Sequence, residues 1–187
     1  MPLPRLFAEN RNMHTNYEFK ARCHDLKELE TILLKKDPFF VGEDRQIDTY
    51  FNVPQGRLKL REGAIENALI HYQRSDAPGA KQSDVTLCQL SPGTVMKECL
   101  SKALGILTVV DKTRKIYFVD NVKFHFDQVA GLGTFVEVEA IDKDGTIGID
   151  ELKRQCNTYA ALFCIKPEQY IAGSYSDLLL AKKSSTG

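Results

Sequence analysis

The chain has 187 residues, and its 25 Lys and Arg balance its 25 Asp and Glu, so no basic surplus indicates a nucleic acid partner. Hydrophobic residues make up 43% and charged residues 27%, a balance typical of one globular domain with its own core. No apolar run approaches the roughly 20 residues that cross a bilayer, so we expect no membrane partner.

The cysteines and the N-terminus indicate the compartment. The five cysteines are odd in number and never form a C-x-x-C pair, which favours reduced thiols over a disulfide or zinc framework. The first residues lack the apolar segment and cleavage pattern of a secretory leader. We therefore expect a cytoplasmic protein with a loose tail over 1–13, one domain over 14–182 and a disordered tail over 183–187.

Alternation of polar and apolar residues predicts about eight strands. They span residues 16–23, 45–53, 57–62, 68–74, 85–90 and 107–119, followed by a hairpin over 121–139. Residues 75–84 are expected to form a polar loop. Helices are predicted over about 25–36, 91–104 and 149–163, with a short one near the C-terminus. Asp25 and Glu28 form a capping box for the first helix, and Ser91 followed by Pro92 opens the second.

The predicted strands have one apolar face, and the helices have matching apolar stripes that can cover it. The opposite strand faces carry too much ordered charge for a packed core. These two features predict an α+β fold, an eight-stranded antiparallel β-barrel that is polar inside and coated outside by amphipathic helices. An open sheet with helices on one face and water on the other is the alternative.

The hairpin over 121–139 places three charged or polar side chains, Lys123, His125 and Asp127, on one face of its first strand. Glu137 and Glu139 share a face of the second strand. A solvated sheet face is the ordinary explanation of such a pattern. His125 is expected to line this face as a hydrogen-bonding residue, with proton transfer as the alternative.

Other predicted strands repeat the pattern with their charges sorted by sign. The cations are Lys59, Arg61, Arg74, Lys112 and Arg114, and the carboxylates are Glu18, Asp127, Glu137 and Glu139. Solvated faces usually intersperse the two signs, because like charges opposite one another destabilise a sheet. A polyphosphate with bound Mg²⁺ or Mn²⁺ would explain the sorting, since Arg and Lys bind phosphate oxygens and carboxylates bind the metal. The pattern by itself leaves a solvated charged sheet equally open.

Several motifs occur in order between about Asn16 and Leu180: E-x-K, R-L-K-L-R-E-G, K-x-R and the hairpin D-x-V-x-G-L-G-x-F-x-E-x-E. Together they resemble the CYTH superfamily, the triphosphate tunnel metalloenzymes. That superfamily includes class IV adenylyl cyclases, thiamine triphosphatases and inorganic or RNA triphosphatases. The segment G-E-D-R-Q-x-D-T-Y-F-N is most similar to the class IV adenylyl cyclase-like bacterial members. The resemblance implies an eight-stranded antiparallel triphosphate tunnel.

The resemblance also implies roles for individual residues. It implies a Mg²⁺ or Mn²⁺ site that includes Glu18, Glu137, Glu139, Asp127 and Asn16. It implies triphosphate contacts from Lys20, Lys59, Arg61, Arg74, Lys112 and Arg114, with Lys123 and His125 beside them. Asp127 and Lys20 are the residues expected to act in catalysis. The superfamily more often has lysine near position 74.

One position departs from the superfamily pattern, which begins E-x-E-x-K where this chain has Asn16. A neutral amide leaves open whether one or two metal ions bind. The implied reaction is conversion of ATP to cyclic AMP and pyrophosphate. The alternatives are hydrolysis of thiamine triphosphate, tripolyphosphate or a nucleoside triphosphate, and binding without turnover. The implied partner is a small-molecule triphosphate, and a homodimer remains open.

Overall fold

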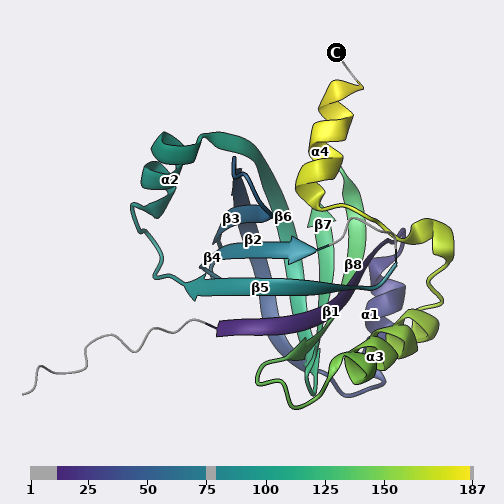
Figure 1. Ribbon diagram of the computed structural model, residues 1–187. Coiled ribbons are helices and arrows are strands. Elements are labelled where there is room, and N and C mark those ends of the chain that lie inside the picture. Colours follow the sequence, from purple (N-terminus) through teal and green to yellow (C-terminus); the bar gives the residue numbers. More distant parts are fainter. Residues whose placement is uncertain (1–11, 75–78, 186–187) are drawn as a thin grey trace, which may run out of the picture.

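A computed structural model of the chain describes residues 12–74 and 79–185, without the side chains of residues 12–14 and 74. The described part contains eight strands and four α-helices (Figure 1). The strands are β1 (Asn12–Arg22), β2 (Phe39–Phe51), β3 (Arg57–Glu62), β4 (Ala68–Arg74), β5 (Lys81–Gln89), β6 (Ile106–Val119), β7 (Val122–Val129) and β8 (Gly133–Asp142). The helices are α1 (Leu26–Leu34), α2 (Met96–Leu104), α3 (Ile149–Leu162) and α4 (Tyr175–Ser184), with a 3₁₀ turn over Pro167–Gln169.

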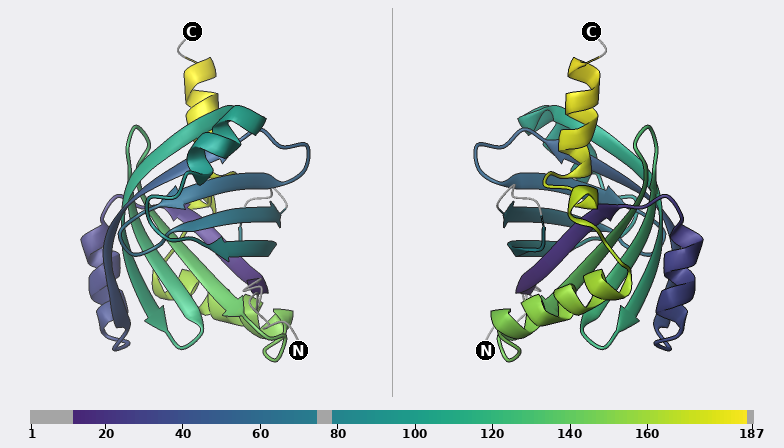
Figure 2. Two further views of the ribbon diagram at one scale, coloured as in Figure 1. Left: turned by 90° about the vertical axis from the view of Figure 1, so that its left-hand side faces the viewer. Right: turned by 90° about the vertical axis from the view of Figure 1, so that its right-hand side faces the viewer.

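The strands close into a barrel in the order β1-β5-β4-β3-β2-β6-β7-β8, with β8 pairing back onto β1. Every neighbouring pair is antiparallel. Figure 2 shows the strands curving around a common axis, with α1 and α3 outside them. The predicted closed sheet is therefore confirmed, and the open-sheet alternative is wrong.

The main hydrophobic core lies between the outside of the sheet and the helices α1 and α3. Alternate residues of β1, β7 and β8 point outward and are fully buried there. These include Phe19, Phe124, Phe126, Val136 and Val138. Leu29 and Leu33 of α1 and Leu152 and Cys156 of α3 pack against them. Because one face of β1, β7 and β8 is buried in this core, the opposite face of the same strands points into the barrel.

Helix α4 brings a tyrosine to the inside of the barrel. Ser174 and Asp177 form a capping box at its start, which fixes the direction in which the chain enters the helix. Asp177 also accepts a hydrogen bond from Arg57 of β3 at 2.8 Å. The first residue of the helix, Tyr175, is buried against Phe135 of β8.

Several predicted boundaries differ from those observed. Helix α2 begins at Met96 and has no side-chain cap, so the helix start predicted at Ser91 is wrong. Gly93 has a φ of +76°, which a right-handed helix cannot contain. Strand β5 begins at Lys81 inside the predicted loop, because it pairs there with β1. Strand β2 begins at Phe39, since it continues along β6.

The predicted tails are only partly covered by the structure. Strand β1 begins at Asn12, inside the segment expected to be a loose tail, and residues 1–11 lie outside the described residues. At the other end, α4 continues to Ser184, two residues into the segment expected to be disordered. Within the described ranges, every helix is too short or too polar to cross a bilayer.

Candidate functional site inside the barrel

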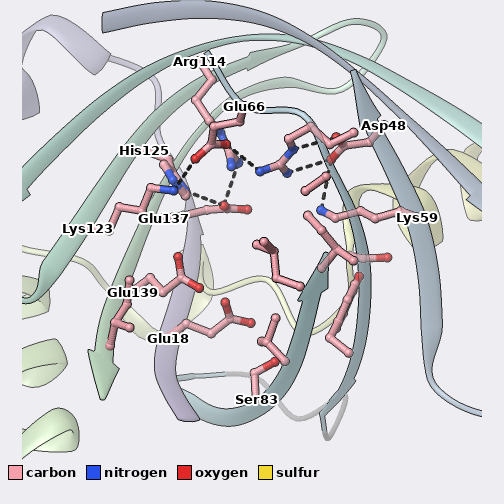
Figure 3. Close-up of a pocket in the computed structure, with 18 of the residues that line it drawn as sticks. Glu18, Asp48, Lys59, Glu66, Ser83, Arg114, Lys123, His125, Glu137 and Glu139 are labelled. Carbon is pink, nitrogen blue, oxygen red and sulfur yellow. Dashed lines mark hydrogen bonds and ion pairs between the residues drawn. The ribbon is translucent and has the colours of Figure 1, made fainter. Parts of the chain in front are cut away.

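The barrel encloses a cavity of about 410 Å³. Its charged lining comes mainly from β1, β2, β3, β6, β7 and β8 and from the turn between β3 and β4 (Figure 3). The charged residues at this cavity include Glu18, Lys20, Asp48, Lys59, Arg61, Glu66, Arg114, Lys123, Glu137 and Glu139. Such a lining binds an ion or a charged molecule rather than a purely apolar one.

The strand register gathers carboxylates on one side of the cavity. Glu18 of β1 lies directly opposite Glu139 of β8, and Lys20 lies opposite Glu137. Two like charges at directly opposite positions destabilise a sheet. Burial first, and the charge of Glu18 second, raise the pKa of Glu139 to about 7. A bound cation would relieve this repulsion.

The carboxylates and the Asn16 amide on this side of the cavity are the candidate ligands for the implied metal. Among the residues that the structure describes, no group of three His, Cys, Asp or Glu side chains is arranged to hold a metal ion. Asn16 donates its amide N–H to Glu139, and its own oxygen is buried with no hydrogen-bond partner in the described part. The oxygen donors of Asn16, Glu18 and Glu139 nevertheless suit a hard divalent cation, and the repulsion described above favours one. The residues present therefore fit such an ion.

Glu137 is held by positively charged and polar neighbours. It contacts Lys20 at 2.6 Å, Arg114 at 2.7 Å and the Nδ1 atom of His125 at 3.1 Å. The Lys20 ammonium also lies 3.7 Å from the ring centroid of Tyr175. Burial alone would raise the pKa of Glu137, but Lys20 and Arg114 hold it well below its usual range. Glu137 thus links the carboxylate side of the cavity to the cations.

Asp127 lies behind Arg114 and does not line the cavity. Arg114 donates two hydrogen bonds to its carboxylate, at 2.6 and 2.5 Å, and the Tyr175 hydroxyl donates a third at 2.7 Å. Burial raises the pKa of Asp127, but the Arg114 guanidinium outweighs it and leaves that pKa lowered. In this arrangement Asp127 orients Arg114 toward the cavity and faces neither Glu18 nor Glu139.

Asp48 of β2 holds three cations at once. Arg61 donates two hydrogen bonds to it, at 2.8 and 2.9 Å, while Lys112 lies at 2.7 Å and Lys59 at 3.0 Å. The charges are closer to balance than these contacts alone suggest, because Arg61 also pairs with Glu66 at 2.8 Å and Lys112 is partly neutral near pH 7. Lys59 and Arg61 nevertheless line the cavity, where their charges attract an anion. Lys112 lies beneath this cluster with its side chain 0% exposed, and burial lowers its pKa to about 7.

His125 is neutral at neutral pH. Burial first, and the charges of Arg114 and Lys123 next, lower its pKa to about 3. The Glu137 carboxylate can only accept, so we assign the proton to Nδ1, which leaves Nε2 as an acceptor. Nε2 is buried and has no hydrogen-bond partner among the described residues. His125 is thus a neutral lining residue, whose Nε2 atom can accept a hydrogen bond.

The wall formed by β4 and β5 is largely apolar. Ile70 comes from β4, and Val85 and Leu87 come from β5. Two tyrosines, Tyr50 and Tyr72, lie beside this wall. An apolar surface facing the charged walls suits the organic part of a ligand whose other part is charged.

The predicted site residues fall into three groups. Those at the cavity are Glu18, Lys20, Lys59, Arg61, Arg114, Lys123, His125, Glu137 and Glu139. Those behind it are Asn16, Lys112 and Asp127. Arg74 ends β4, and its side chain lies outside the described part of the structure.

Sequence reasoning missed Asp48 and Glu66, which lie among the cations, so the prediction of a row of unmixed cations is wrong. Alternation along β2 could have placed Asp48 on the inward face. Glu66 lies in a turn, where no periodic signal exists. Tyr175 is also absent from the predicted site, yet its hydroxyl donates a hydrogen bond to Asp127.

Comparison with known proteins gives the family. A family model described as the CYTH domain matches residues 14–171. The chain belongs to the CYTH domain family. Comparison with curated protein sequences gave no match.

Solved structures similar to this CYTH domain share its fold. A conserved hypothetical protein from Pyrococcus furiosus is 21% identical, with a TM-score of 0.74 over 87% of this chain and 99% of that chain. A proposed adenylate cyclase from Vibrio parahaemolyticus is 19% identical, with a TM-score of 0.65 over 88% of this chain and 97% of that one. A proposed adenylyl cyclase from Hippeastrum, described as having a dominant triphosphatase activity, is 13% identical, with a TM-score of 0.54 over 92% and 96% of the two chains.

Proposed function

We propose that this CYTH protein is a Mg²⁺- or Mn²⁺-dependent enzyme that acts on a triphosphate inside the barrel. The observation that carries the proposal is a cavity inside the barrel that is lined both by Lys59 and Arg61 beside Asp48 and by a repelling pair of glutamates, Glu18 and Glu139. A triphosphate with its metal ion complements both features, since it brings anionic oxygens and a cation together.

In this proposal the cations bind the phosphate oxygens. Lys59 and Arg61 come from β3, Arg114 from β6 and Lys20 from β1, so they approach one ligand from different sides of the ring. The carboxylates Asp48 and Asp127 fix the orientation of Arg61 and Arg114 by paired hydrogen bonds. Such prepositioned charges stabilise negative charge that develops during phosphoryl chemistry.

Glu18 and Glu139, with Asn16 and Glu137 beside them, would hold the metal ion. A divalent ion bound there supplies charge neutralisation and polarises the phosphate oxygens. Asn16 supplies an oxygen without a charge, which favours one ion over two.

We favour a class IV adenylate cyclase-like reaction. In it, the ribose 3′-hydroxyl of ATP attacks the α-phosphorus, a new P–O bond forms, and pyrophosphate leaves as the P–O bond to the β-phosphate breaks. The hydroxyl proton passes to a basic group. The apolar wall of β4 and β5 supports an organic triphosphate, because inorganic tripolyphosphate has nothing to place against Ile70 or Leu87. The name of the similar Vibrio protein agrees with this choice.

Triphosphate hydrolysis is the second candidate. The similar Hippeastrum protein is described as having a dominant triphosphatase activity, and hydrolysis would use the same cations. Binding without turnover is the third, supported by the missing glutamate at Asn16.

The test is to incubate the protein with ATP, thiamine triphosphate or tripolyphosphate, each with Mg²⁺ or Mn²⁺, and to separate cyclic AMP, pyrophosphate and orthophosphate. We expect cyclic AMP and pyrophosphate from ATP, and orthophosphate would instead indicate the triphosphatase. Lys59→Met should abolish turnover. Lys102→Met is the matched control, because Lys102 is an exposed residue of α2 that pairs with Glu98. If none of the substrates gives a product with either metal, the enzyme proposal fails.

A further inference from the structure

The Glu66 carboxylate lies between cations of two strands, β3 and β7, that are not neighbours in the ring. It accepts from Arg61 of β3 at 2.8 Å and forms an ion pair with Lys123 of β7 (Figure 3). A third donor, the Gln46 side-chain amide, lies 2.9 Å from the same carboxylate. Two cations and an amide N–H that converge on one anionic group are also what binds a phosphate.

This carboxylate is charged. Burial alone would raise the pKa of Glu66, but Arg61 and then Lys123 lower it well below its usual range. The side chain is 21% exposed, so it faces the cavity rather than the packed interior. Glu66 therefore places a full negative charge on the path of any anion that approaches Arg61 and Lys123.

The backbone that carries Glu66 is held by hydrogen bonds that do not involve the Glu66 carboxylate. The buried Asp44 carboxylate accepts from the N–H of Ala64 at 2.7 Å and of Glu66 at 3.1 Å. Asn67 and Gly63 close the turn with hydrogen bonds to each other. Because the turn is anchored in this way, rotation of the Glu66 side chain is enough to vacate the position between the two cations.

We propose that Glu66 is an internal competitor, whose carboxylate holds the position of one phosphate group between Arg61 and Lys123 and must be displaced when a polyphosphate binds. This inference rests on the proposed function. When the polyphosphate binds, Arg61 and Lys123 lose their ion pairs with Glu66 and gain contacts with a phosphate group. The observed affinity is therefore lower than the two cations would give without Glu66. Glu66 is thereby a specificity-determining residue, because it penalises only anions that reach this position.

The test is calorimetric titration of the full chain with inorganic tripolyphosphate in EDTA, which measures binding without turnover. Glu66→Gln keeps the shape and removes the charge, and we expect it to bind tripolyphosphate about tenfold more tightly than the wild type, the effect of losing one charge-assisted contact. Glu62→Gln is the matched control. Glu62 belongs to the same hairpin and pairs with Lys97 at 2.7 Å in a half-exposed position. The Glu62→Gln substitution removes the same charge, and this variant should bind tripolyphosphate as tightly as the wild type does.

The outcomes separate this inference from the proposed function. If the wild type binds and Glu66→Gln binds equally or more weakly, Glu66 is no competitor and the inference is wrong, while the proposed function stands. Equal tightening in Glu62→Gln would also overturn it, because net charge would then explain the effect. If neither protein binds tripolyphosphate, the inference is wrong, whereas the proposed function is decided separately by the turnover assay with metal. Glu66→Ala replaces Glu66→Gln if the latter does not fold, with the same expectation.

Discussion

Replacing Asp48 with Asn removes the carboxylate that three neighbouring cations share. Arg61, Lys59 and Lys112 all lie within 3.0 Å of it. The Asp48 side chain is 1% exposed, so water cannot take its place without a rearrangement of the barrel. Asn has nearly the same shape, so the substitution tests the charge and not the packing.

We expect the variant to lose about 3 to 5 kcal/mol of unfolding free energy, the usual effect of removing one partner from a buried ion pair. For a domain of this size that corresponds to a fall in Tm of roughly 10 °C. Lys112 decides how the loss depends on pH. Its pKa is already lowered to about 7 in the folded wild type and falls further without Asp48. At pH 6 the unfolded variant therefore binds a proton at Lys112 that the folded variant does not, whereas the folded wild type largely keeps this proton. The loss is therefore larger at pH 6 than at pH 9.

The assay is urea unfolding of the wild type and the variant at both pH values. Asp111→Asn is the control, because Asp111 forms a pair with Arg45 at 2.9 Å on the surface and should matter by less than about 1 kcal/mol. Equal losses in the two variants would refute the reasoning that Asp48 sustains the cation cluster.

Three further predictions concern other parts of the site. If the proposed metal site is correct, Mn²⁺ raises the Tm of the wild type, and Glu139→Gln should abolish that rise. In EDTA the wild type should lose stability relative to this variant as pH rises from about 4.5 through about 7, since folding raises the pKa of Glu139, and an unchanged difference would contradict this. Tyr175→Phe removes the hydroxyl that donates to Asp127 and should lower the unfolding free energy by about 1 to 2 kcal/mol in urea, whereas a neutral effect would mean that the bond is unimportant. Gly63→Ala should lose about 1 to 3 kcal/mol, because a Cβ there would overlap the Asp44 carboxylate, and wild-type stability would show that the turn adapts.

The sequence predicted best where alternation decides which way a side chain points. Along β1, β7 and β8 the period of two assigned Lys20, Lys123, His125, Glu137 and Glu139 to one face, and all five line the cavity. The same alternation supplied the opposite, apolar faces that the helices cover. These residues could be predicted because strand geometry fixes the direction of each side chain locally.

How deeply a side chain is buried, and which side chains it contacts, could not be predicted from strand alternation. Lys112 and Arg114 share a strand face, yet Lys112 is buried beneath Asp48 while Arg114 reaches the cavity. Glu66 enters from a turn, and Tyr175 enters from a helix at the far end of the chain. Such positions depend on which strands, helices and turns pack together, and this packing is set by contacts between residues that are distant in the sequence.

The amino-acid sequence by itself indicated the family, most of the strands and the charged character of one strand face, because motif order and strand periodicity are local properties. Only the tertiary structure decided that β8 pairs with β1, so that Glu18 meets Glu139, and that acidic side chains hold the cations in place. The physical reason is that electrostatic energy depends on distance and burial, and closure of the ring sets both.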